Sequence, residues 1–267
     1  MKLNKAIFLI VSLLTLVGLL MALDNVATFN GSNQYIQING TRTYDTAFSG
    51  LGAVTLEVWI KPTSLQTGGT SIPRNTVINI PRSSSTIGAH IFLVDNGRIR
   101  LDGRSTNEDY RGVISTKRVK TGVWTHIAGV LDFQNDRVLL YVNGVLWEES
   151  NPAGFASRTY VSGGSGTREV IGAGVDLPAN YWFHGAMDEL RIWGVARTQQ
   201  QIWDNIYSTS PSGSGLMGYY KFDQDSGTTV NDSSTPNRNG TYNPSAGWST
   251  GGIVPEYFFR TLATGNW

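Results

Sequence analysis

The stretch Val138–Trp147, VLLYVNGVLW, decides how the rest of the chain is interpreted. Two short apolar runs, Val138–Val142 and Val145–Trp147, flank the dipeptide Asn143-Gly144. Asn-Gly tolerates the positive φ angles of a type I′ turn, so this pattern predicts a β-hairpin. The fold around it is therefore expected to be antiparallel and built from short strands.

Other parts of the chain repeat this pattern of short strands and turns. His90–Val94 and Arg98–Leu101 flank Asn96-Gly97, which predicts a second hairpin. Val54–Ile60, VTLEVWI, alternates apolar and other residues with the period of a strand. Further strands are predicted at Val26–Asn30, Tyr35–Ile38, Trp124–Leu131, Glu169–Ile171 and Ala186–Trp193. This spacing favours an all-β fold, a two-sheet antiparallel sandwich or jelly roll.

One short helix is predicted after the last core strand. Thr198 can cap it, and Gln201 completes a capping box three residues later. Ile202 and Ile206 then lie on one face of the helix.

The composition excludes several classes of protein. The 267 residues include no Cys, so disulfides, thiolate metal sites and a cysteine nucleophile are absent. The formal net charge of +1 gives no long-range field, which argues against nucleic acid as a partner. Gly is frequent at 31 residues and charged residues are few at 15%, a balance typical of many turns between short strands.

The N-terminus predicts export. Lys2 and Lys5 precede the apolar run Ala6–Ala22, the pattern of a secretory signal peptide over residues 1–22. An uncleaved membrane anchor is the alternative, but the run is at the short edge of a membrane span. The sequence contains no second apolar run of this length, so we expect no membrane span in the mature chain. We expect a secreted protein, extracellular or at the cell surface.

Composition also divides the rest of the chain. The strand series predicts one domain over residues 23–210. Pro211–Gly215, PSGSG, is typical of a linker, and it opens an accessory segment over residues 211–252. Residues 253–267 are interpreted as the start of a further, truncated segment.

Several stretches, taken in order, resemble one family. They are Val26–Gly31 with Tyr35-Ile36, Leu56–Pro62 (LEVWIKP), Trp124–Val130 (WTHIAGV), Leu140–Gly144 (LYVNG) and Phe183–Trp193 (FHGAMDELRIW). Together they resemble a laminin-G-like jelly roll of the concanavalin A-like lectin/glucanase superfamily, over about residues 23–207. The segment after Tyr219 resembles an accessory segment of bacterial surface proteins.

The resemblance implies one structural Ca²⁺ where the opening strand meets the closing strand. Asp188 and Asn30 are the ligands that it implies, since calcium prefers several hard oxygen donors. Asn30 stands where the family carries an Asp, which removes one negative charge. The alternative is that both side chains bond backbone groups at strand ends.

Aromatic residues in loops are candidate sugar contacts, because sugars stack on aromatic faces beside a few polar groups. Tyr181 and Trp182 lie just before the closing strand, and Tyr110 lies with Asp102 and Arg104 in the middle of the chain. The alternative for these aromatic residues is packing within the protein.

An enzyme of this fold would need two facing carboxylates. Asp188 and Glu189 are adjacent on a strand and point to opposite faces. The Glu-x-Asp-x-x-Glu motif of the superfold's hydrolases is absent. Glu57 can pair with Glu189, or Glu189 can be held by Arg191. The sequence therefore predicts a non-catalytic module that binds a glycan or an extracellular protein; a glycoside hydrolase or lyase, and a structural spacer, are the alternatives.

Overall fold

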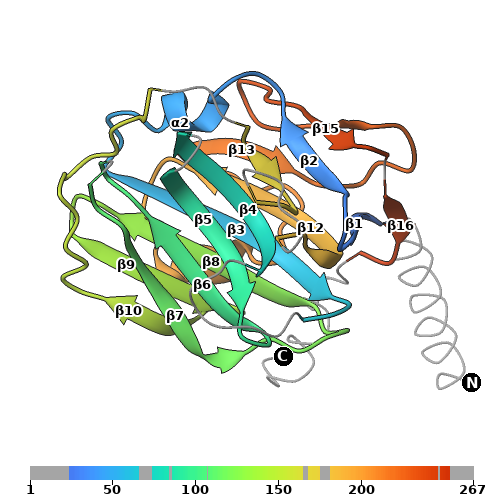
Figure 1. Cartoon of the computed structure of the whole chain (residues 1–267), viewed down its shortest axis with the longest axis horizontal. Helices are drawn as coiled ribbons and strands as arrows, with labels where there is room; N and C mark the ends of the chain where they lie inside the picture. Colours follow the sequence, from blue (N-terminus) through green and yellow to red (C-terminus); the bar gives the residue numbers. More distant parts are fainter. Residues whose placement is uncertain are drawn as a thin grey trace, which may run out of the picture.

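The computed structural model describes residues 24–65, 74–83, 86–106, 108–164, 168–174, 181–245 and 247–252. In this part of the chain, two antiparallel sheets of eight strands each stack face to face (Figure 1). The predicted all-β, two-sheet sandwich is confirmed, as is the short helix after the core strands. The predicted signal peptide and the segment over residues 253–267 lie outside the described residues. None of the described helices is long and apolar enough to cross a bilayer.

Sheet A forms the rear layer in Figure 1. Its strands are β1 (Asn25–Asn30), β3 (Ala53–Pro62), β8 (Thr125–Asp132), β9 (Arg137–Val142), β10 (Val145–Ser150), β12 (His184–Trp193), β13 (Leu216–Tyr220) and β16 (Trp248–Thr250). They run in the order β10, β9, β8, β3, β12, β1, β16. The first half of β12 pairs with β1 and its second half pairs with β13. β12 therefore holds the start of the chain and its later part in one sheet.

Sheet B forms the front layer, with β4 to β7 nearest the viewer (Figure 1). Its strands are β2 (Tyr35–Ile38), β4 (Arg74–Ser83), β5 (Thr86–Val94), β6 (Arg98–Gly103), β7 (Arg111–Arg118), β11 (Val170–Ile171), β14 (Thr229–Val230) and β15 (Gly240–Asn243). They run in the order β14, β15, β2, β11, β4, β5, β6, β7.

The segment after Pro211 is part of the sandwich rather than a separate unit. β13 and β16 extend sheet A, and β14 and β15 extend sheet B. Tyr220 and Tyr242 from this segment are buried in the main core. Composition alone suggested a linker and an accessory segment, because a Gly/Ser-rich turn looks the same whether it joins domains or strands.

Both predicted hairpins are confirmed, with Asn143 and Gly144 at φ 49° and 73° in the β9–β10 turn. The core lies between the sheets, where Leu101 of β6 packs over Gly129 of β8. A Cβ at residue 129 would overlap Leu101, so glycine there lets the layers approach closely.

The predicted helix is α3 (Gln199–Asn205). Thr198 and Gln201 form the capping box, and Ile202 and Ile206 are both buried. Ile202 packs against a small apolar cluster on the outer face of sheet A, formed with Ala128, Val130, Leu139 and Tyr141. α3 therefore covers part of this face.

A buried ion pair network lies beside α3 on the same face. Arg191 Nη2 donates to Glu189 at 2.6 Å, which confirms the predicted partner of Glu189. The Arg191 side chain is also 3.9 Å from Glu57, whose carboxylate is fully buried and lies 3.4 Å from Arg197. Burial raises the pKa of Glu57, against the opposing effect of the two guanidinium groups.

A second helix, α2 (Thr43–Ala47), was not evident from the sequence. The backbone N–H groups of its first turn bond to a buried carboxylate. Glu169, next to β11, accepts hydrogen bonds from the backbone N–H groups of Tyr44 and Asp45 at 2.7 to 2.9 Å. Burial nevertheless raises the pKa of Glu169 to about 7. Asp24 behaves in the same way: burial and the neighbouring Asp223 raise its pKa to about 7.

These two carboxyl groups predict a pH-dependent stability. The unfolded chain ionises at the ordinary carboxyl pKa, so the stabilisation is complete below about pH 4.5 and is lost as the pH rises to about 7. We expect the melting temperature to fall by roughly 7 °C or more over that interval, because Glu169 alone contributes about 3 kcal/mol. Glu169→Gln should reduce this fall by at least a third in differential scanning calorimetry. An unchanged slope in the variant would exclude Glu169 as its source.

Candidate functional site

The outer face of sheet B, turned away from the core, gathers polar side chains from three neighbouring strands. Along β5, Ala89, Ile91 and Leu93 belong to the core cluster, so His90 and Phe92 point to the outer face. Register extends this face across β4, β5 and β6. We define the polar face as Thr76, Asn79, His90, Phe92, Arg100 and Asp102, together with Arg104 and Tyr110 from the loop after β6.

Two cross-strand rows make up the polar face. Asn79, His90 and Asp102 are direct neighbours in the first row, which continues to Gly112 on β7. A Cβ at Gly112 would overlap the Asp102 carboxylate. Glycine at this position therefore leaves the space that the carboxylate occupies.

Thr76, Phe92 and Arg100 form the second row. The Arg100 guanidinium lies 5.6 Å from the Phe92 ring centroid and 5.4 Å from that of Tyr110. Arg100 therefore spans two aromatic rings, an arrangement that keeps its long side chain flat on the sheet.

Asp102, Arg104 and Tyr110, predicted as ligand contacts, lie together as the sequence suggested. The Tyr110 hydroxyl donates to Asp102 Oδ2, which also forms an ion pair with Arg100 Nε at 2.7 Å. The Arg104 guanidinium lies 4.8 Å from the Tyr110 ring and donates to the Asp109 carbonyl at 2.8 Å. These contacts join the three side chains to one another and to Arg100.

The residues of the polar face on β4 and β5 carry polar atoms without a hydrogen-bond partner among the described residues. Thr76 Oγ1, Asn79 Oδ1 and both ring nitrogens of His90 have no hydrogen-bond partner, although each residue is at most 2% exposed. The large majority of buried side-chain polar atoms in proteins have a hydrogen-bond partner. The residues that the structure describes leave these atoms without a partner, and ordered water or a ligand can supply one.

Burial fixes the chemical state of His90. Burial, together with the charge of the nearby Arg100, lowers the pKa of His90 to about 3. The imidazole is neutral at physiological pH, with one N–H donor and one acceptor nitrogen. Burial also raises the pKa of Asp102, against the lowering effect of Tyr110, Arg100 and Arg104.

The two aromatic residues predicted as ligand contacts, Tyr181 and Trp182, have different surroundings in the structure. Trp182 is 6% exposed and packs against Tyr35 with ring centroids 5.8 Å apart, so it is not an open stacking platform. Tyr181 is half-buried, and its carbonyl accepts from the Thr76 backbone N–H at 3.1 Å. Tyr181 therefore adjoins the polar face, whereas the packing alternative describes Trp182.

The two residues predicted for calcium are not brought together. Asn30 pairs with His184, four positions before Asp188 on β12, which separates them by about 13 Å. Asn30 Oδ1 accepts backbone N–H bonds from residues 32 to 34, and Asp188 Oδ1 accepts from the backbone of Glu189. Over the described residues, no cluster of three or more His, Asp or Glu is placed to hold a metal. The two side chains cannot share one ion at this distance; calcium binding by the chain stays a prediction.

Comparison with known proteins agrees with this architecture. Residues 29–203 match the model of the laminin-G type of the concanavalin A-like lectin/glucanases superfamily. No protein with a curated description matches the chain.

Three known structures with the same fold come from proteins of different kinds. A candidate carbohydrate-binding protein from Bacteroides ovatus aligns with 23% identity and a TM-score of 0.62, over 86% of this chain and 60% of its own. This chain thus spans about three fifths of that protein. A heptameric pentraxin from Limulus polyphemus aligns with 15% identity and a TM-score of 0.59, over 87% and 98%. The CBM40 domain of a Ruminococcus gnavus sialidase, bound to α2,3 sialyllactose, aligns with 15% identity and a TM-score of 0.51, over 68% and 98%.

Proposed function

We propose that this chain, which belongs to the concanavalin A-like lectin/glucanase superfamily, is a non-catalytic module that binds a glycan on the polar face of sheet B. One observation carries the proposal: buried, unpaired hydrogen-bonding atoms of Thr76, Asn79 and His90 lie in register beside a fixed cluster of Arg100, Asp102 and Tyr110.

The unpaired atoms suit sugar hydroxyl groups. A hydroxyl group donates one hydrogen bond and accepts others. Neutral His90 offers one donor and one acceptor, and Asn79 Oδ1 offers an acceptor on the neighbouring strand. Binding sites commonly combine a few fixed polar groups with aromatic side chains, and the half-buried Tyr110 supplies the aromatic side chain here.

The named relatives support the choice of ligand class. The Bacteroides protein is described as carbohydrate-binding, and the CBM40 domain holds a sialylated sugar. These likenesses concern the fold, so the ligand assignment for this chain rests on the polar face itself.

The carboxylates favour binding over hydrolysis. A glycosidase holds its two carboxyl groups about 5–9.5 Å apart with the bond to be cleaved between them. Glu57 and Glu189 instead share Arg191, and Glu57 is fully buried. On the polar face, Asp102 is engaged by Tyr110 and Arg100. The proposal places the module outside the cell, as the N-terminal sequence predicted.

The test is a glycan array, run with Ca²⁺ and again with EDTA, followed by calorimetric titration of the strongest hit. We expect His90→Ala and Asn79→Ala each to weaken binding about tenfold, because losing one buried hydrogen bond to a ligand costs roughly 1–2 kcal/mol. Thr229→Ala is the matched control: the residue is exposed, lies on β14 of the same sheet, and is four strands from Asn79, about 19 Å.

Each outcome has a clear meaning. Hits that disappear in EDTA would show that glycan binding requires calcium. Hits that survive EDTA would show that it does not. A blank array, or hits unaffected by both substitutions, would contradict the proposal and favour a protein-binding or spacer role.

A further inference from the structure

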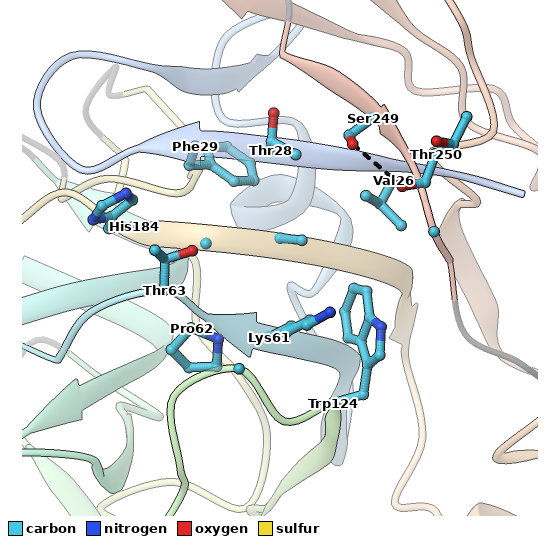
Figure 2. A pocket seen from close by; sticks show the side chains of 14 residues that line it. Val26, Thr28, Phe29, Lys61, Pro62, Thr63, Trp124, His184, Ser249 and Thr250 are labelled. Atoms are coloured by element: carbon cyan, nitrogen blue, oxygen red, sulfur yellow. Dashed lines mark hydrogen bonds between the residues drawn. The ribbon is translucent and has the colours of Figure 1, made fainter.

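A separate pocket of about 340 Å³ lies on the outer face of sheet A, on the opposite layer from the polar face. Figure 2 shows its arrangement: β12 runs through the middle, Lys61 and Trp124 stand on one side, and Thr28, Ser249 and Thr250 lie on the other. The walls therefore come from β3 and the residue before β8 on one side and from β1 and β16 on the other.

Register explains why a hollow forms here. Thr28 of β1, Ala186 of β12 and Lys61 of β3 are direct cross-strand neighbours, so their side chains share one face. Ala186 carries only a methyl group between two longer side chains. The row therefore dips at β12, and the dip is the floor of the pocket.

The pocket combines an aromatic surface with a single permanent charge. Lys61 Nζ lies 6.0 Å from the centroid of the half-buried Trp124 ring. Lys61 forms no ion pair with any other residue that the structure describes. The pocket lining contains no Asp or Glu, and Lys61 is its one Lys or Arg. An uncompensated ammonium group in an acid-free pocket attracts an anionic group.

The remaining lining is suited to a sugar ring. Thr28, Ser249 and Thr250 line the side opposite Lys61, and Ser249 and Thr250 are exposed (Figure 2). Ser249 pairs with Val26 and shares the outer face with Thr28, and its hydroxyl donates to the Thr250 carbonyl at 3.2 Å. At one end, His184 Nδ1 and Ser64 Oγ are hydrogen-bonded at 2.9 Å, which fixes the imidazole at the rim. The volume is at the lower end of the range for small-molecule sites, which suits one or two sugar units.

We propose that this pocket is a second binding site, specific for an acidic saccharide unit. The carboxylate of the sugar pairs with Lys61, its apolar C–H face stacks on Trp124, and a hydroxyl group bonds to Ser249. The site is independent of the proposed function, because none of these residues belongs to the polar face and the two surfaces lie on opposite sides of the sandwich.

The experiment titrates the full chain with methyl β-glucuronide, the neutral methyl β-glucoside and inorganic sulfate, by calorimetry and ligand-observed NMR. We expect the glucuronide to bind at least tenfold more tightly than the glucoside and than sulfate. Lys61→Gln should reduce glucuronide binding to the level of the glucoside, whereas Trp124→Ala should weaken both sugars. A rise in salt concentration should weaken binding of the glucuronide but not of the neutral glucoside.

Lys117→Gln is the matched control, because Lys117 also lies over a tryptophan ring, 5.3 Å from Trp147, but not in the pocket. It should leave glucuronide binding unchanged, and melting temperatures should show that all variants are folded. Equal binding of the two sugars, or full binding by Lys61→Gln, would overturn the proposal. Glucuronide binding lost in His90→Ala but kept in Lys61→Gln would assign the acid to the polar face and also overturn it, while leaving the proposed function intact.

Discussion

Arg191→Ala is expected to lower the free energy of unfolding by about 3–5 kcal/mol, the cost of removing one partner from a buried ion pair. Arg191 is fully buried, and it bonds Glu189 and the carbonyl groups of Asn205 and Ser208. It therefore joins β12 to the end of α3 and balances buried negative charge at the same time.

The largest part of this effect should come from Glu57. Both of its carboxylate oxygens are buried, and the charges of Arg191 and Arg197 are the main groups that offset its burial. When Arg191 is removed, Glu57 keeps the Arg197 contact at 3.4 Å and the His126 Nε2 contact at 3.7 Å. Burial lowers the pKa of His126, so that imidazole carries no compensating charge. The pKa of Glu57 should then rise further, so the variant should be least stable at high pH.

Urea unfolding of the full chain measures this loss. The double variant Glu57→Gln/Arg191→Met should recover part of it, because a neutral amide then replaces the buried Glu57 carboxylate. Glu189 keeps its hydrogen bond from the Tyr219 hydroxyl, and Arg197 keeps its bond to the Gln201 carbonyl. Arg137→Ala is the surface control: its ion pair with Glu149 is partly exposed on both sides, and its loss should cost less than about 1 kcal/mol. A similar small loss for Arg191→Ala would show that the network contributes little.

Local signals accounted for the elements that the sequence predicted correctly. The Asn-Gly turns, the Thr198 capping box and the alternation of Val54–Ile60 each depend on residues that are close in the chain. α2 has no side-chain cap, and its first N–H groups bond Glu169, more than 120 residues away. A partner at that distance leaves no local pattern, so the helix could not be predicted.

The candidate site shows the same limit. Asp102, Arg104 and Tyr110 are close in sequence and were predicted together, but Asn79 and His90 come from two other strands. Alternation within His90–Val94 shows that His90 and Phe92 share a face, yet only the sheet order makes Asn79 and Asp102 the neighbours of His90. For Asn30 and Asp188, the resemblance implied strands that do meet, but not the register that separates the two residues.

Asp102→Ala is expected to weaken glycan binding by 100-fold or more and to lower stability by about 2–3 kcal/mol. Asp102 is 1% exposed, and its carboxylate holds Arg100 and Tyr110 in place. Without it, a partly buried guanidinium loses its charge-assisted bond, whose value is about 1.5–3 kcal/mol. Arg100 and Tyr110 then no longer keep one geometry beside His90.

Gly112→Ala tests whether binding depends on the position of the Asp102 carboxylate as well as on its presence. The new Cβ overlaps the Asp102 carboxylate and the Leu101 carbonyl oxygen, so the carboxylate must move although no polar group has been removed. We expect binding to fall at least tenfold in calorimetric titration, with a smaller loss of stability than in Asp102→Ala. Asp102→Asn, which keeps the shape but not the charge, should lie between the two in affinity.

Thr229→Ala, at the far edge of sheet B, should leave both affinity and melting temperature unchanged. If Gly112→Ala bound the glycan normally while Asp102→Ala did not, the Asp102 charge alone would be required and the fixed geometry of the cluster would not. If both variants bound normally, the ligand would lie elsewhere, because no ligand seated beside His90 can avoid the neighbour that shares its row.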